Sequence, residues 1–138
     1  MNMDRKDLKN YKYNQQWIKD QMEYIEEQKT RVNKLGAVLS NMPIGSRKVQ
    51  DSMAEKIAII LDGLNEILNN IVEEENKQKQ IIKQLEEIEQ PYRLILYKVY
   101  IQAKSLVVTA AEMNYNYEYM KKMHGISLSK FEEVTKSY

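Results

Sequence analysis

The 138-residue sequence lacks cysteine and has a single histidine, His124. Without cysteine, the chain can form no disulfide, no thiolate metal site and no thiol nucleophile. One histidine also argues against a histidine-rich metal centre and a Ser-His-Asp triad. Glycine and proline are scarce, at four and two residues, while 30% of the residues are charged. This composition favours long helices with polar faces over a β-sandwich.

Little in the sequence could support catalysis. The four glycines are isolated from one another, at positions 36, 45, 63 and 125, so no glycine-rich loop is available to hold a phosphate group. The acidic runs, such as Glu73–Glu75, belong to charged helical segments, where solvation explains them. We therefore expect a protein that is not an enzyme and has no catalytic residues, no cofactor and no metal site.

Neither sign of charge dominates, since 21 Lys or Arg are set against 20 Asp or Glu. This balance excludes a histone-like polycation, whose affinity for nucleic acid comes from a large basic excess. No apolar run approaches the roughly 20 residues of a membrane-spanning helix. The N-terminal residues are charged and lack the apolar segment of a signal peptide. We expect a cytoplasmic protein that does not contact a membrane.

Apolar residues recur at a near-heptad spacing between Trp17 and Leu39. Ile18, Ile25 and Val32 lie seven residues apart, and Leu39 continues the series. The positions between them on the same stripe are Met22, Gln28 and Leu35. Because residues three or four apart share one face of a helix, this spacing predicts an amphipathic helix.

Pro43 and Gly45 interrupt this pattern and predict a loop. A second helix is expected to begin at Asp51 or Ser52, because Ser52 and Glu55 have the spacing of a capping box. Its apolar stripe consists of Ile57, Leu61, Leu64, Ile67 or Leu68, Ile71, Ile81 or Ile82, Leu85 and Ile88. Extended to residue 90, this helix would be a rod of roughly 58 Å. Two long helices joined by a short loop predict an antiparallel hairpin.

The stripe has a gap between Val72 and Ile81, where eight polar residues follow one another. The gap could be a solvated section, a polar layer of a coiled coil or a break between two helices, and the absence of glycine and proline favours a continuous helix. A hairpin of two helices leaves apolar residues exposed on its outer sides. Homodimerisation would cover them, and the alternative is a monomer with the hairpin folded over the rest of the chain.

The segment after residue 90 has a different organisation. Pro91 is suited to the start of a third helix, which is expected to run to about Ala103. Ser105 can cap a short helix over residues 106–113. Asn114 begins a three-residue polar turn, and a last helix is expected from Tyr117 to about residue 134. Helix, short helix, tight turn and longer helix is the layout of a helix-turn-helix.

Three stretches of this segment resemble region 4 of the sigma-70 factors. Gln90–Leu106 resembles the opening helix and its serine cap, Val107–Asn116 the first helix of the helix-turn-helix, and Tyr117–Phe131 the recognition helix. Asn114 stands in place of the usual turn glycine, and Ser127 stands where alanine is common. Nothing in the chain resembles sigma region 2, so promoter melting is not implied.

The chain as a whole is similar to a group of small phage and prophage proteins of Gram-positive bacteria. The similarity includes Pro43–Arg47 and Val49–Lys56 as well as the C-terminal segment. Proteins of that group join an N-terminal helical hairpin to a sigma-region-4-like helix-turn-helix. The resemblance implies regulation of phage genes.

Charge is distributed unevenly along the chain. Residues 91–138 contain seven Lys or Arg and four Asp or Glu, whereas residues 1–90 contain 14 and 16. The positive C-terminal end favours DNA there. The candidate DNA-binding residues are Asn116, Tyr117, Glu118, Lys121, Lys122 and His124 on the last helix, with Arg93 and Lys104 outside it.

Most of the candidates also have a purely structural interpretation. Asn116 could read adenine or cap the helix, and Lys121 and Lys122 could contact phosphates or guanine edges. Three further candidates could touch the DNA or have no role in binding. Tyr117 could be a plain surface tyrosine and His124 an incidental surface histidine. Glu118 could simply be a carboxylate at the positive end of the helix dipole. Arg93 and Lys104 could clamp phosphates or be solvated. Most of the ten tyrosines are expected to pack in or beside the core.

The sequence thus predicts an all-α protein with a long antiparallel helical hairpin, residues 1–90, and a helix-turn-helix domain, residues 91–138. We expect a dimeric, phage-type transcriptional regulator that binds duplex DNA. The alternatives are an adaptor that binds host RNA polymerase or another protein without reading DNA, and a structural coiled-coil protein.

Overall fold

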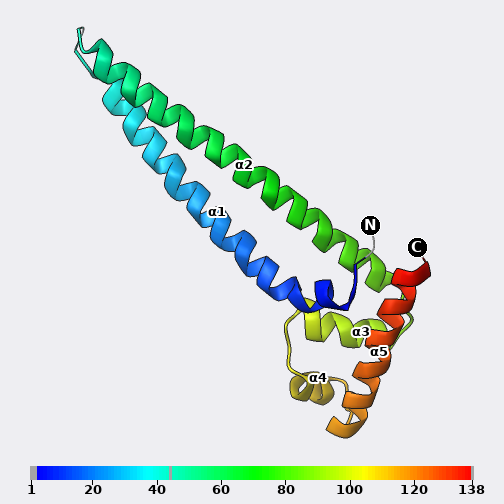
Figure 1. The fold of residues 1–138 in the computed structure, drawn as a ribbon. Helices are drawn as coiled ribbons and strands as arrows, with labels where there is room; N and C mark the ends of the chain where they lie inside the picture. Colours follow the sequence, from blue (N-terminus) through cyan, green and yellow to red (C-terminus); the bar gives the residue numbers. More distant parts are fainter. Residues whose placement is uncertain (1–2, 44, 138) are drawn as a thin grey trace. The chain divides into compact units, whose positions relative to one another are not determined.

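The computed structural model describes residues 3–43 and 45–137, and all the regular secondary structure of this part of the chain is helical (Figure 1). The elements are α1 (Arg5–Ser40), α2 (Arg47–Glu86), α3 (Tyr92–Leu96), the π-helical segment η1 (Tyr97–Ile101), α4 (Leu106–Glu112) and α5 (Tyr117–Ser137). The predicted all-α class, with a long hairpin followed by shorter helices, is confirmed. Within residues 3–43 and 45–137 no helix is both long and apolar enough to cross a membrane.

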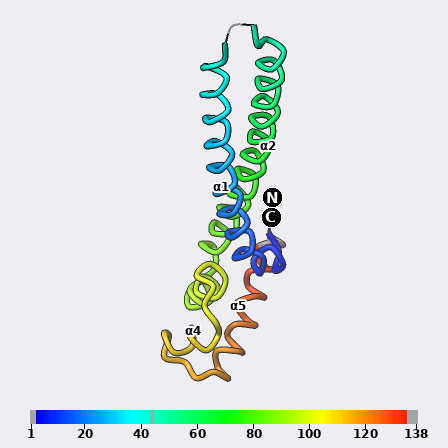
Figure 2. Tube along the Cα trace, turned by 90° about the vertical axis from the view of Figure 1, so that its left-hand side faces the viewer, coloured from blue at the N-terminus to red at the C-terminus, as the bar shows by residue number. Residues whose placement is uncertain are grey.

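The helices α1 and α2 run antiparallel, side by side, as Figures 1 and 2 show. They are joined by the predicted loop, in which Gly45 has a φ of +105°. The prediction that Ser52 and Glu55 form a capping box is wrong, because both lie inside α2. The carbonyl of Ser46 already accepts the amide of Gln50 at 2.9 Å, and nothing between these residues interrupts helical propagation.

The first helix begins at Arg5, well before the predicted stripe. The Asp4 carboxylate accepts the amide of Asp7 at 2.9 Å, and the Asp7 carboxylate accepts the amide of Asp4 at the same distance. This is a reciprocal capping box with aspartate in both roles. The hydrogen bond from the Asp7 amide lowers the pKa of Asp4 below its ordinary value.

The chain divides into two compact units, one of which comprises residues 16–74. The core of this unit consists of Ile18, Ile25, Leu64 and Ile71, with Ile60 and Ile67 packed against it. Met22 and Leu61, which were predicted in the stripe, are exposed, and of the alternatives Ile67 and Leu68 it is Ile67 that packs against the core. In α2 the buried and half-buried residues follow one another at alternating intervals of three and four residues. Leu61 and Leu68 each come one residue after a member of this series and so lie outside the buried face.

The predicted continuity of the second helix is confirmed, because α2 is unbroken across residues 73–80. Two polar residues, Glu74 and Gln78, occupy the positions in the gap where the series of buried and half-buried residues, spaced alternately by three and four, would place apolar side chains. Gln78 is buried and Glu74 is half-buried. Of the three alternatives, the structure therefore contains the polar layer.

The other compact unit comprises residues 3–15 and 75–137. One of its cores joins both ends of the hairpin to the C-terminal helices and consists of Met3, Leu8, Tyr11, Ile81, Leu85, Ile88, Leu96, Leu128 and Phe131. The second core lies among α3, η1, α4 and α5 and consists of Ile95, Ala110, Met120 and Met123. The residues on either side of the expected domain boundary at residue 90 thus share one core, while the boundary itself stays a prediction.

Candidate nucleic-acid interface

The helix α4, a four-residue turn and α5 follow one another in the predicted order. The hydroxyl of Ser105 accepts the amide of Val108 at 3.1 Å and caps α4, as predicted. Asn114 has a φ of +59°, and the amide of Tyr115 donates to the carbonyl of Ala110 at 2.9 Å. This arrangement is a Schellman motif with asparagine in the left-handed position that glycine usually takes. The turn therefore ends α4 and fixes where α5 starts.

Asn116 caps α5, because its Oδ1 accepts the amide of Tyr119 at 2.8 Å. Asn116 was predicted either to read adenine or to cap the helix, and the structure shows it capping α5. One face of α5 packs into the two cores, with Met120, Met123, Leu128 and Phe131 all buried as predicted. The opposite side of its first two turns is consequently left on the surface.

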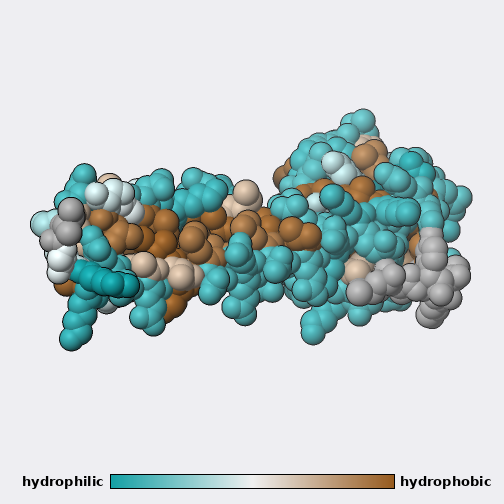
Figure 3. Space-filling view, turned by 90° about the horizontal axis from the view of Figure 1, so that it is seen from above, coloured by the Kyte–Doolittle hydropathy of each residue, from teal (hydrophilic) through white to brown (hydrophobic). Residues whose placement is uncertain are grey.

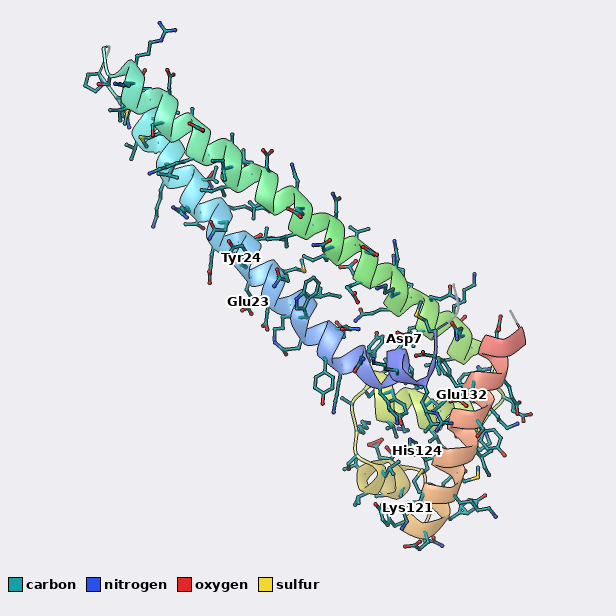
Figure 4. The ribbon with its side chains drawn as sticks, in the orientation of Figure 1. Asp7, Glu23, Tyr24, Lys121, His124 and Glu132 are labelled. Atoms are coloured by element: carbon teal, nitrogen blue, oxygen red, sulfur yellow. The ribbon has the colours of Figure 1, made fainter. Side chains whose placement is uncertain are left out.

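The surface of these first turns carries Tyr117, Glu118, Lys121 and Lys122, all exposed. The Lys121 ammonium lies 3.1 Å from the Glu118 carboxylate and 5.1 Å from the centre of the Tyr117 ring. Figure 4 labels Lys121 near the start of α5. Exposed pairs of this kind contribute little free energy. Lys121 can therefore exchange these contacts for an anionic partner at little cost in free energy.

His124 is only partly on this surface. Its Nε2 lies 2.6 Å from the hydroxyl of Tyr100, and the two rings are stacked with centres 5.7 Å apart. Burial lowers the pKa of His124 below its ordinary value, and the nearby cations Lys9 and Arg5 lower it further. The ring is therefore neutral near pH 7 and joins α5 to η1.

Arg93 and Lys104 are both engaged within the protein. The Arg93 Nε donates to the carbonyl of Ile88 at 2.8 Å and so ties the turn after α2 to α3. The Lys104 ammonium lies 2.7 Å from the Glu112 carboxylate, which also accepts Lys98 at 2.7 Å. These two lysines lower the pKa of Glu112. Both predicted phosphate clamps thus have structural roles.

A groove of about 510 Å³ lies beside Lys104 and contains cations that the sequence analysis missed. It is lined by Lys9, Asn10, Lys12, Tyr13, Val99, Tyr100, Ala103, Lys104, Ser105 and Leu106. The missed lysines come from the first turns of α1, where four basic residues are set against two acidic ones in residues 1–15. That local excess was visible in the sequence, but its position beside residues 99–106 depends on the fold.

The two compact units differ in charge. The unit that contains α5 carries fourteen Lys or Arg and ten Asp or Glu, whereas residues 16–74 carry seven and ten. A net charge of +4 is therefore confined to one unit, against −3 on the other. Among the described residues no group of three or more acidic or histidine side chains could hold a metal ion. The positive charge of the unit that contains α5 favours an anionic partner over a cationic one.

No match was found when the chain was compared with models of known protein families, with curated proteins and with solved structures.

Proposed function

We propose that this protein is a DNA-binding transcriptional regulator of the phage type, in which α4 and α5 form a helix-turn-helix. The observation that carries the proposal is the exposed polar start of α5, with Tyr117, Lys121 and Lys122 presented directly after a capped tight turn. In a helix-turn-helix the N-terminal residues of the second helix contact base edges in the major groove. The resemblance of residues 90–134 to sigma region 4 leads to the same proposal.

The core behind this surface supports a role in recognition. Buried Met120 and Met123 hold α5 against Ala110 of α4, whose small side chain allows close helix packing. The buried hydroxyl of Ser127 donates to the carbonyl of Met123 at 2.7 Å and so satisfies its own hydrogen bond inside the core. A recognition helix needs such a rigid support, because base contacts require fixed geometry.

The test is a selection of random-sequence duplex DNA by the purified protein, followed by binding measurements on the enriched sequence. Replacing Lys121 and Lys122 with alanine should weaken binding by roughly tenfold or more at about 100 mM salt, because two cations near phosphates or guanines are lost. The matched control replaces Lys19 and Lys34 with alanine, since both are exposed lysines on α1. Equal affinities of the two variants would contradict the assignment of α5.

The second candidate function is an adaptor that binds RNA polymerase or another protein. Glu118 favours it, because this carboxylate beside Lys121 reduces the positive charge of the surface. Salt separates the two functions, because the logarithm of DNA affinity falls steeply and linearly with the logarithm of salt concentration. Failure to enrich any duplex at low salt would favour the adaptor.

We further propose that two copies of the chain associate through residues 16–74. Met22, Leu61, Leu68 and Val72 are 54%, 45%, 43% and 55% exposed beside the buried seam of this unit. Figure 3 shows apolar surface gathered along the hairpin. A dimer would cover these side chains and supply two helix-turn-helix units for two half-sites.

A further inference from the structure

We propose that the groove between the N-terminal turns of α1 and residues 99–106 binds a phosphodiester of the DNA backbone through Lys9 and Lys12. The inference rests on the proposed function and extends it, since the expected interface contains no residue of α1. The groove would bind the backbone beside the site that α5 reads.

The composition of the groove selects an anion. None of its ten lining residues is acidic, and three of them are lysines. Lys104 is held by Glu112, but this single carboxylate is shared with Lys98, so the three groups together retain one positive charge. Among the residues that the structure describes, neither Lys9 nor Lys12 forms an ion pair, and the Lys12 ammonium lies 5.0 Å from the centre of the exposed Tyr13 ring.

The backbone that carries the two lysines is held in place. Leu8 directly precedes Lys9 on the helix, and Tyr11 directly precedes Lys12. Both are buried in the core that also contains Leu96 and Phe131. Lys9 and Lys12 are three residues apart, so their side chains lie on neighbouring turns of one face. A fixed helix with two long cationic side chains suits phosphate, which lysine binds as a point charge without strict geometry.

The opposite wall of the groove is equally well defined. Ala103 has a φ of +56°, and the amide of Lys104 donates to the carbonyl of Lys98 at 3.0 Å. This hydrogen bond ties the loop back to η1. His124 stacks on Tyr100 of this wall, and its pKa is lowered first by burial and then by the cations Lys9 and Arg5. Asn10, Tyr13 and Ser105 add polar side chains of the types that contact phosphates in protein–DNA complexes.

The position of the groove agrees with helix-turn-helix docking. In such complexes the first helix of the motif crosses the DNA backbone while the second enters the major groove. Ser105 and Leu106, at the start of α4, line the groove. A duplex read by α5 would therefore pass its backbone close to Lys9 and Lys12.

The experiment measures salt-dependent binding of the duplex that the wild-type protein selects. One variant carries Lys9→Gln and Lys12→Gln, and the matched control carries Lys19→Gln and Lys34→Gln on the same helix. All four lysines are exposed, so both variants should fold, which circular dichroism checks. We expect the first variant to bind roughly tenfold to a hundredfold more weakly near 100 mM salt, with a salt slope smaller by about 2.

The sequence preference provides a second measurement. Phosphate contacts carry no base information, so the Lys9 and Lys12 variant should enrich the same motif as the wild type. If the wild type binds DNA and this variant matches the Lys19 and Lys34 control, the groove proposal is wrong while the proposed function stands. If the wild type binds no duplex at low salt, the proposed function fails and the groove proposal fails with it.

Discussion

At the scale of single residues, the pair of His124 and Tyr100 shows how packing changes the chemistry of a side chain. The sequence places His124 on the outer side of the last helix, as a candidate DNA contact. In the fold its ring is half-buried against Tyr100, and burial raises the pKa of that tyrosine. The neutral histidine therefore contributes to the packing between α5 and η1.

This packing predicts a dependence of stability on pH. The folded-state pKa of His124 lies below its ordinary value of 6.5, so the unfolded chain binds more protons in the range between the two pKa values. The free energy of unfolding should be constant above this range and fall as pH decreases through it. Urea denaturation between about pH 5 and pH 8 measures the effect. Asp4 and Glu112 contribute little to it, because this pH range begins above their ordinary pKa values of 3.8 and 4.5 and the fold lowers both pKa values.

The control for this prediction is His124→Gln, which removes the titrating group and retains a polar side chain. Its free energy of unfolding should be nearly flat over the same pH range. A variant that keeps the full slope of the wild type would show that another group is responsible.

At the scale of elements, the segment before α1 is attached to α2 by one buried amide. Gln84 is 1% exposed, and its Oε1 accepts the amide of Met3 at 2.7 Å while its Nε2 donates to the carbonyl of Met3 at 3.1 Å. Both backbone groups of Met3 are thus paired by one side chain. The same region carries Lys9 and Lys12, so this attachment also determines the position of the groove.

Replacing Gln84 with alanine should lower the free energy of unfolding by about 2 kcal/mol, because two backbone groups lose their partner inside the protein. Urea denaturation followed by circular dichroism measures this loss. Lys83→Ala is the matched control, since Lys83 is exposed on the neighbouring position of α2. Similar unfolding midpoints for the two variants would mean that Gln84 does not hold the segment.

At the scale of the whole molecule, the proposed dimer depends on apolar side chains that the hairpin itself does not cover. Leu61→Glu combined with Leu68→Glu should convert the dimer to a monomer, because two charges would be buried in the interface. Sedimentation velocity measures the change. Gly63→Glu combined with Asn70→Glu adds the same charge at the same spacing on exposed positions of α2 that lie away from Leu61, Leu68 and Val72, and should leave the dimer intact. A monomeric wild type at micromolar concentration would contradict the proposal.

The sequence by itself determined the features that depend on neighbours along the chain. Heptad spacing and scarce glycine predicted two long helices, and Pro43 and Gly45 predicted the loop between them. Ser105, Asn114 and Asn116 predicted a cap, a tight polar turn and a second helix start. These predictions succeeded because capping and turn geometry involve backbone groups only two to five residues away. The Asp4 and Asp7 capping box was equally local and could have been recognised.

Only the tertiary structure decided which side chains remain available for a partner. Arg93, Lys104 and His124 have the right chemistry for DNA, but each is engaged by a group that packing brings near: a carbonyl, a carboxylate and a phenol hydroxyl. Conversely, Lys9 and Lys12 become candidates for binding an anion because the start of α1 lines the same groove as residues 99–106. Contacts between residues far apart in sequence leave no periodic pattern, since they follow from how whole helices bury their apolar faces.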